Sequence, residues 1–106
     1  MKRAKKERLE AAGWRVGSAD DFLGLSKEEV AFVEMKLALA ETLRKRRQAR
    51  RLTQTQLAKS IGSSQSRVAK MEAADPSVSI DLLMRSLLAL GASKKDVAKV
   101  ISSNSA

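Results

Sequence analysis

The strongest constraint on how this chain folds lies in the stretch from Thr53 to Glu72, which reads TQTQLAKSIGSSQSRVAKME. The Thr53 hydroxyl can cap a helix, and apolar residues follow it at the spacing of one helical face: Leu57, Ala58 and Ile61. Gly62 can end this helix, because glycine adopts the left-handed cap conformation without steric penalty. A second helix can begin after Ser63 or Ser64, with Val68 and Met71 facing inward. The pattern predicts two short helices joined by a tight turn, a helix-turn-helix.

The outer face of the second predicted helix is polar and carries Gln65, Ser66, Arg67 and Lys70. A glutamine amide offers a donor and an acceptor together, which matches the N6 and N7 edge of adenine. A lysine can reach O6 or N7 of guanine. The simpler interpretation is a solvated helix surface. We favour DNA binding because these side chains follow a motif that can present them to a groove.

The charge of the chain is concentrated in its C-terminal two-thirds. All 106 residues together carry a formal net charge of +9. Residues 1–34 are balanced, so the excess lies in residues 35–106, and it is densest in 44–51, directly before the predicted motif. Clustered lysine and arginine favour a polyanionic partner through counterion release, although a solubilising surface is the alternative. Arg50 and Arg51 are therefore predicted DNA contacts, while about half of this basic run is expected to be solvated.

Composition argues against several other classes of protein. The chain has no cysteine and no histidine, which removes disulfides, thiol chemistry and the commonest metal and acid–base ligand. The carboxylates are scattered, so we expect no enzyme activity, no metal and no cofactor. No apolar run approaches the roughly 20 residues that span a bilayer. The basic start of the chain leads into no apolar signal core, so we expect a cytoplasmic protein with no membrane partner.

Helical patterns also cover the segments on either side of the motif. The capping-box sequence Ser26-Lys27-Glu28-Glu29 opens a long pattern toward Arg51, with a break near Met35 as an alternative to one continuous helix. Its predicted inner face carries Val30, Val33, Leu37, Ala40 and Leu43. Ser79 can cap a leucine-rich helix that Gly91 ends, and Ser93 with Asp96 can open a last helix. That last helix would turn Val97, Val100 and Ile101 inward. The prediction is an all-α domain of five helices over residues 27–102.

Residues 1–26 differ from that domain. They are predicted to form a flexible N-terminal arm, since they are rich in charge and too short for a core of their own. The arm nevertheless carries large apolar side chains: Trp14, Val16, Phe22, Leu23 and Leu25. They can fold back onto the basic domain or bind another protein. We favour a partner, because aromatic anchors in such segments are typical of coupled folding and binding.

From about Lys36 to Gly91 the sequence resembles the Cro/C1-type (XRE) helix-turn-helix family of phage and bacterial repressors. The residues that carry the resemblance are LTQTQLAKSIGSSQSRVAKME and the following IDLLMRSLLALG. The resemblance implies a lambda-repressor-like DNA-binding domain in which Gln54 contacts a phosphate and supports the recognition helix. It also implies base-facing Ser64, Gln65, Ser66 and Lys70, a phosphate contact from Arg67, and a structural ion pair between Arg47 and Glu72. Ala74 departs from the glycine of many members, so the recognition helix is expected to run slightly further.

A narrower resemblance covers nearly the whole chain. The segment ADDFLGLSKEEVAFVEMKLALAETL before the motif is similar to HigA-type antitoxins and to small regulators encoded beside RelE/ParE-like toxins. That resemblance implies a homodimer that binds double-stranded DNA at a pseudo-palindromic operator, represses its own operon, and neutralises a toxin through the arm. Candidate dimer contacts are Leu88, Val97, Val100 and Ile101. The alternative is a stand-alone XRE-family regulator with no toxin partner.

Overall fold

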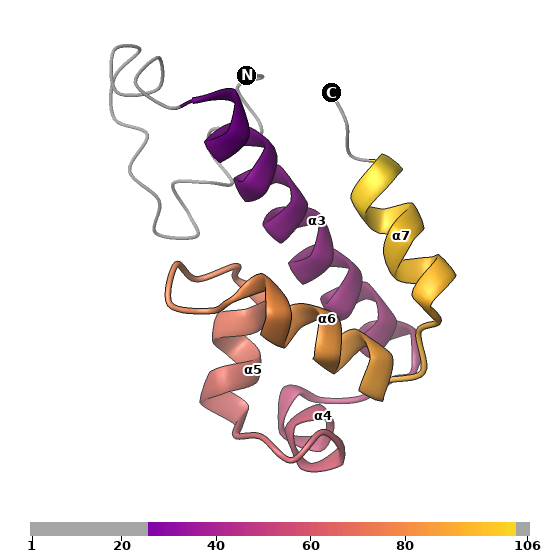
Figure 1. Ribbon diagram of the computed structural model, residues 1–106. Coiled ribbons are helices and arrows are strands. Elements are labelled where there is room, and N and C mark those ends of the chain that lie inside the picture. The colour runs from indigo at the N-terminus through magenta and orange to yellow at the C-terminus, as the bar shows by residue number, and fades with distance from the viewer. Residues whose placement is uncertain (1–25, 104–106) are drawn as a thin grey trace.

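The computed structural model describes residues 26–103, and the regular secondary structure of this part of the chain is all α-helix (Figure 1). Its five helices are α3 (Lys27–Ala49), α4 (Gln54–Ser60), α5 (Gln65–Glu72), α6 (Ile80–Ala89) and α7 (Lys94–Ser103). The predicted all-α class and the five helices are confirmed. The arm residues Trp14, Val16, Phe22, Leu23 and Leu25 lie outside the described residues. Within residues 26–103, no helix combines the length and hydropathy that crossing a membrane requires.

Helix α3 is the central helix of the domain, and α5, α6 and α7 pack against it. It starts at Ser26, whose side chain accepts a hydrogen bond from the backbone of Glu29, and it runs without interruption past Met35. Helices α5, α6 and α7 all contact it (Figure 1). Its buried face includes the predicted Val33, Leu37, Ala40 and Leu43, and also Leu39 and Lys36. One continuous helix therefore connects the start of the described chain to the motif.

The two predicted short helices are α4 and α5, and they pack against each other. Thr53 caps α4 in a reciprocal capping box with Gln56, and Ser64 caps α5 by accepting from the backbone of Arg67. Leu57 and Val68 are fully buried between the elements. Together with Ala58 and Met71, they join α4 and α5 to the core beneath α6. The pattern of capping and apolar residues thus predicts this part of the fold correctly.

Four helices end in the same way, with one residue in the left-handed conformation. Gly62 and Gly91 do this after α4 and α6, at φ values of 68° and 101°. Arg51 and Ala74 do it after α3 and α5, at 55° and 53°, although neither is a glycine. In each case the next residue donates back to the preceding helix, as Asp75 does to the Lys70 carbonyl at 3.0 Å. This hydrogen-bond pattern is a Schellman cap.

The expectation that α5 would run past Ala74 is wrong. Helix α5 ends at Glu72, and Ala74 takes the left-handed conformation that it was expected to avoid. The physical reason is burial: Ala74 is 1% exposed and belongs to the core. Packing of its methyl group offsets the backbone penalty of about 1–2 kcal/mol.

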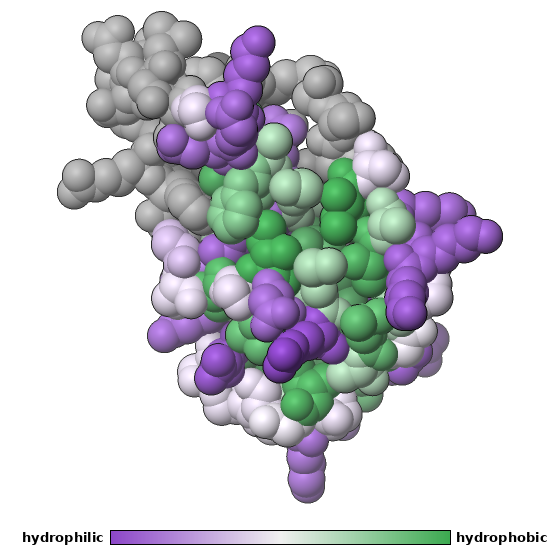
Figure 2. All heavy atoms as spheres, in the orientation of Figure 1, coloured by the Kyte–Doolittle hydropathy of each residue, from purple (hydrophilic) through white to green (hydrophobic). Residues whose placement is uncertain are grey.

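Helices α6 and α7 complete the core. Ser79 caps α6, and Ser93 with Asp96 forms a capping box at the start of α7. Leu83 and Leu87 are fully buried on α6. Val97 is 5% exposed, so the prediction that it faces inward is confirmed, and it has little surface left for contact with a second chain. Val100 and Ile101 are half-buried against the core, and Figure 2 shows apolar side chains gathered on the face formed by α3, α6 and α7.

Candidate nucleic-acid interface

The start of α5 presents the polar residues that the sequence singles out. Ser64 is the cap residue, and its hydroxyl accepts from the backbone N–H of Arg67 at 3.2 Å. The Ser66 hydroxyl lies 3.3 Å from that of Ser64. The four predicted contacts on the helix itself are all exposed: Gln65, Ser66, Arg67 and Lys70. Because Val68 and Met71 anchor the opposite face, these side chains have a fixed backbone beneath them.

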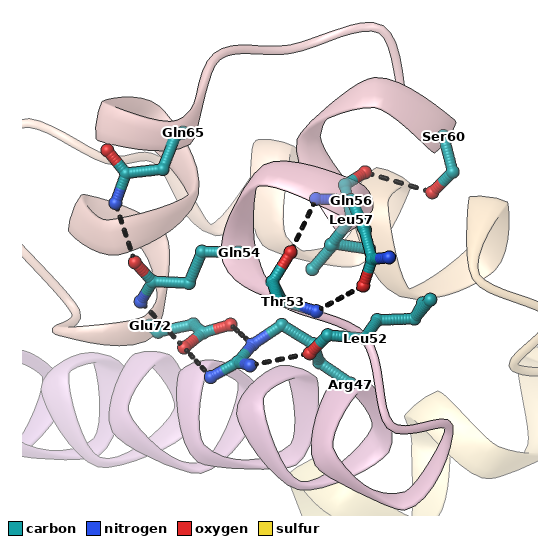
Figure 3. A network of polar contacts seen from close by, with 9 residues as sticks. All are labelled: Arg47, Leu52, Thr53, Gln54, Gln56, Leu57, Ser60, Gln65 and Glu72. Carbon is teal, nitrogen blue, oxygen red and sulfur yellow. Dashed lines mark hydrogen bonds and ion pairs between the residues drawn. The ribbon is translucent and has the colours of Figure 1, made fainter.

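A chain of polar contacts runs from α3 through α4 to Gln65 (Figure 3). Arg47 donates from Nε to Glu72 Oε2 at 2.5 Å and from Nη2 to Glu72 Oε1 at 3.0 Å. Gln54 donates from Nε2 to the same Oε1 at 3.2 Å. Gln65 in turn donates from Nε2 to Gln54 Oε1 at 2.8 Å. Each link therefore orients the next one.

The ion pair between Arg47 and Glu72, at one end of this series of polar contacts, is sheltered from solvent. The side chains of Arg47 and Glu72 are 14% and 5% exposed, and Arg47 also donates from Nη1 to the Leu52 carbonyl at 2.8 Å. The hydrogen bonds that Arg47 donates to Glu72 raise the pKa of Arg47 above its ordinary value. A two-bond arginine–carboxylate contact of this kind is both strong and geometrically specific. The ion pair predicted between Arg47 and Glu72 is present, and it ties α3 to the last turn of α5.

The orientation of Gln65 follows from this chain. Its amide nitrogen is directed at Gln54, and its carboxamide oxygen points away from that residue in Figure 3. Gln54 is half-buried and uses both ends of its amide, one toward Glu72 and one toward Gln65. It therefore supports Gln65, while its contact with a phosphate stays a prediction. An outward carbonyl oxygen is an acceptor for base donors such as adenine N6 or cytosine N4.

The arginines of the basic run before the motif lie in different surroundings. Arg46 forms an ion pair with Asp96 on α7 at 3.1 Å, and Arg47 faces Glu72. The Arg50 guanidinium lies against the turn between α6 and α7, where a Cβ built on Gly91 would be 2.8 Å from Arg50 Nη2. Arg51 is exposed in its left-handed turn. DNA contacts from Arg50 and Arg51 stay predictions, and Arg50 already packs against the protein.

Sequence reasoning missed one charged residue close to this interface, Lys36. It is 2% exposed, and its Nζ lies 3.4 Å from the Pro76 carbonyl in the loop that follows α5. Burial lowers the pKa of Lys36, while the nearby Asp75 carboxylate opposes this effect. The helical spacing could have indicated its burial, because Lys36 lies three residues after Val33 and so falls on the apolar face of α3.

Comparison with known proteins agrees with this geometry. A family model described as a helix-turn-helix domain matches residues 38–100, which include the second half of α3, all of α4, α5 and α6, and most of α7. Neither the curated proteins nor the solved structures include a match to the chain. The matched region is more than half of the sequence, and within it α4, the Gly62 turn and α5 form the motif itself. The chain therefore belongs to the helix-turn-helix domain family and is a DNA-binding regulator.

Proposed function

We propose that this chain is a transcriptional repressor that recognises a specific DNA sequence with α5 in the major groove. The observation that carries the proposal is the position of Gln65, exposed on the first turn of α5 and oriented by Gln54. A helix-turn-helix presents the start of its second helix to the base edges of the major groove, which is about 12 Å wide. In such a pose an outward glutamine distinguishes base pairs by about 1–3 kcal/mol.

The proposal includes a homodimer on a pseudo-palindromic operator. Two-fold symmetric dimers bind half-sites about one helical turn, or roughly 34 Å, apart. The apolar face of α6 and α7 supports this part of the proposal, because Leu88 on α6 is 46% exposed. Val100 and Ile101 lie half-buried on α7. These three residues are the candidate dimer contacts that remain after Val97 is assigned to the core.

Selection of bound duplexes from a random pool tests the DNA proposal. We expect an inverted repeat with half-site centres about 10–10.5 base pairs apart, and two chains per duplex by analytical ultracentrifugation. A reporter placed behind the selected sequence is expected to be repressed when the protein is expressed. A bound pool without any common sequence would contradict sequence-specific recognition. One chain per duplex would contradict the dimer alone.

The proposal further assigns residues 1–26 to a RelE/ParE-like toxin partner. It is supported by the resemblance of the sequence to HigA-type antitoxins and by the apolar residues of this segment, among them Trp14 and Phe22. Co-expression with the product of the adjacent gene tests it. We expect Trp14→Ala and Phe22→Ala to weaken the complex, whereas Gln65→Ala leaves it intact. If neither variant weakens a complex, the stand-alone regulator is the better description.

A further inference from the structure

The C-terminal end of α3 contacts the start of α7 and the turn before it. Arg46 Nη2 lies 3.1 Å from Asp96 Oδ2 on α7, and the Arg50 guanidinium lies against Gly91 in the turn between α6 and α7. Arg46 and Arg50 are four residues apart, so both reach from the same side of α3. Figure 1 shows this turn and the C-terminal end of α3 at the same end of the domain. Two arginines from one helix end therefore hold the beginning of α7.

Asp96 joins the cap of α7 to α3. Its Oδ2 atom accepts a hydrogen bond from the Ser93 backbone N–H at 2.9 Å, and its own backbone N–H donates to the Ser93 hydroxyl at 3.0 Å. The same Oδ2 atom forms the ion pair with Arg46. The capping box defines where α7 begins, so the ion pair fixes that point relative to α3.

Gly91 leaves room for the Arg50 side chain. A Cβ built on Gly91 would lie 2.8 Å from Nη2, 3.7 Å from Cζ and 3.9 Å from Nη1 of Arg50. The guanidinium therefore occupies the space that a side chain at residue 91 would fill. On either side of Gly91, Leu90 and Ala92 are buried in the core. Arg50 thus contacts a turn that is itself held in place by packing.

The same end of α3 also holds the proposed recognition helix. Arg47 lies between Arg46 and Arg50 in sequence and forms the ion pair with Glu72 on α5. Helix α5 is connected to this end of α3 through Arg47, and α7 is connected to it through Arg46 and Arg50. The angle between α5 and α7 is therefore fixed through α3.

We propose that Arg46, Arg50 and Asp96 are positioning residues that set the spacing between the two half-sites of the operator. In a two-fold dimer that associates through α6 and α7, the distance between the two copies of α5 depends on the angle between α5 and the dimer face. Adjacent base pairs lie about 3.4 Å apart along DNA, so a small rotation of α7 changes the preferred spacing by one base pair. This inference rests on the proposed homodimer, and it makes Arg50 a positioning residue instead of a DNA contact.

Selection from duplexes of varied spacing tests the proposal. Each duplex carries two inverted copies of the selected half-site, and the pool covers every spacing over about one helical turn. We expect the wild-type protein to prefer one spacing. Arg46→Gln, Arg50→Gln and Asp96→Asn are each expected to reduce that preference, relative to the neighbouring spacings, by about threefold, which is within the range for a partly exposed ion pair. The preferred half-site sequence is expected to stay the same.

Asp96→Asn separates a positioning role from a direct phosphate contact. Loss of an arginine charge can itself weaken binding to DNA, whereas loss of a carboxylate charge cannot remove a phosphate contact. We expect Asp96→Asn and Arg46→Gln to reduce the spacing preference equally. The double variant is expected to show no further reduction, because both substitutions break one ion pair.

Two control variants separate this role from stability and from charge. Ser79→Ala removes the cap of α6 and lowers stability, but it leaves the contacts between α3 and α7 in place. Arg44→Gln removes an exposed charge from the same helix. Both variants are expected to keep the spacing preference of the wild-type protein.

The possible outcomes distinguish this inference from the proposed function. An unchanged spacing preference in Arg46→Gln, Arg50→Gln and Asp96→Asn would overturn the inference and leave the proposed function standing. A slope of log affinity against log salt lowered by about 0.9 in Arg50→Gln, with its spacing preference retained, would assign Arg50 to a DNA phosphate instead. Wild-type protein that binds as one chain per duplex would overturn the homodimer and this inference together.

Discussion

Glu72 is the residue through which α3, α4 and α5 are connected by polar contacts. It accepts two hydrogen bonds from Arg47 and one from Gln54, and its side chain is 5% exposed. A carboxylate in this position has little contact with water, so these hydrogen-bond donors must compensate for the cost of burying its charge. The same donors set the direction in which Gln54 supports Gln65. A buried ion pair here fixes the orientation of α5, the proposed recognition helix.

Removing Glu72 is expected to destabilise the fold strongly. Glu72→Ala leaves the Arg47 guanidinium buried without its partner, and we expect a loss of about 3 kcal/mol in the free energy of unfolding. Chemical denaturation measures it. The control is Asp81→Ala, which breaks an ion pair with Arg85 whose side chains are 74% and 78% exposed. That control is expected to change stability by less than about 1 kcal/mol. Equal losses in both variants would contradict the role given to Glu72.

The contacts of individual side chains were predicted from the sequence where the partner lies nearby in the chain. The prediction was incomplete where the partner is distant in sequence. The Ser26, Thr53, Ser64 and Ser79 caps depend on backbone groups three residues away, and all four are present. Arg50 against Gly91 and Lys36 against Pro76 depend on segments about forty residues apart in sequence. A long cationic side chain has several directions open to it, and only the packed fold selects one.

The ends of the helices carry the main backbone strain of the described chain. Arg51 and Ala74 hold left-handed conformations that glycine adopts at lower energy. They differ in what offsets that penalty, because Ala74 is buried and Arg51 is exposed. A cap signal based on glycine alone therefore finds Gly62 and Gly91 and misses the other two. The sequence carries no local mark of these left-handed residues.

Replacing Arg51 is expected to separate stability from DNA binding. Arg51→Gly relieves the left-handed strain, so we expect it to be about 1 kcal/mol more stable than Arg51→Ala by thermal unfolding. Both variants lose the same charge, and their affinities for a labelled duplex are expected to fall equally. Ala74→Gly serves as the comparison, since loss of its buried methyl offsets the relief. An Arg51→Ala variant as stable as Arg51→Gly would contradict the assigned strain.

The contribution of the start of α7 to the stability of the fold is expected to fall in acid. The hydrogen bonds from the Ser93 backbone and hydroxyl, with the charge of Arg46, lower the pKa of Asp96. A lowered carboxyl pKa stabilises the folded state above the unfolded pKa of about 4, and this contribution is lost as pH falls through the folded pKa. We therefore expect Asp96→Asn to lower Tm at neutral pH, with the difference disappearing in strong acid. A Tm difference that is the same at both ends of the pH range would contradict this.

At the scale of the whole molecule, helix α3 connects the proposed DNA-binding face and the proposed dimer face. Its last turns hold α5 through Arg47 and α7 through Arg46. The proposed recognition residues lie on α5, and the apolar face shown in Figure 2 includes α6 and α7. Charge clustering and helical periodicity predicted this division in outline. Helical periodicity also predicted Val97 on the inner face of α7, where it is 5% exposed, but it could not show that Val100 and Ile101 keep part of their surface exposed, because that depends on tertiary packing.

Two equally exposed apolar residues allow the proposed dimer face to be tested. Leu88 on α6 and Phe32 on α3 are both 46% exposed. A charged side chain at a buried dimer contact is strongly unfavourable, so we expect Leu88→Lys to weaken self-association at least tenfold in sedimentation velocity. Phe32→Lys is the control and is expected to leave it unchanged. Loss of association in Phe32→Lys alone would place the dimer contact on α3 instead.

The central claim is that α5 reads DNA sequence through Gln65, and the most direct test is the affinity ratio between the selected operator and a scrambled duplex of the same composition. Gln65→Ala is expected to lose about 1–3 kcal/mol of that preference, while its affinity for the scrambled duplex changes little. Gln48→Ala, which removes an exposed glutamine from α3, is expected to keep the wild-type ratio. An unchanged ratio in Gln65→Ala would contradict the account.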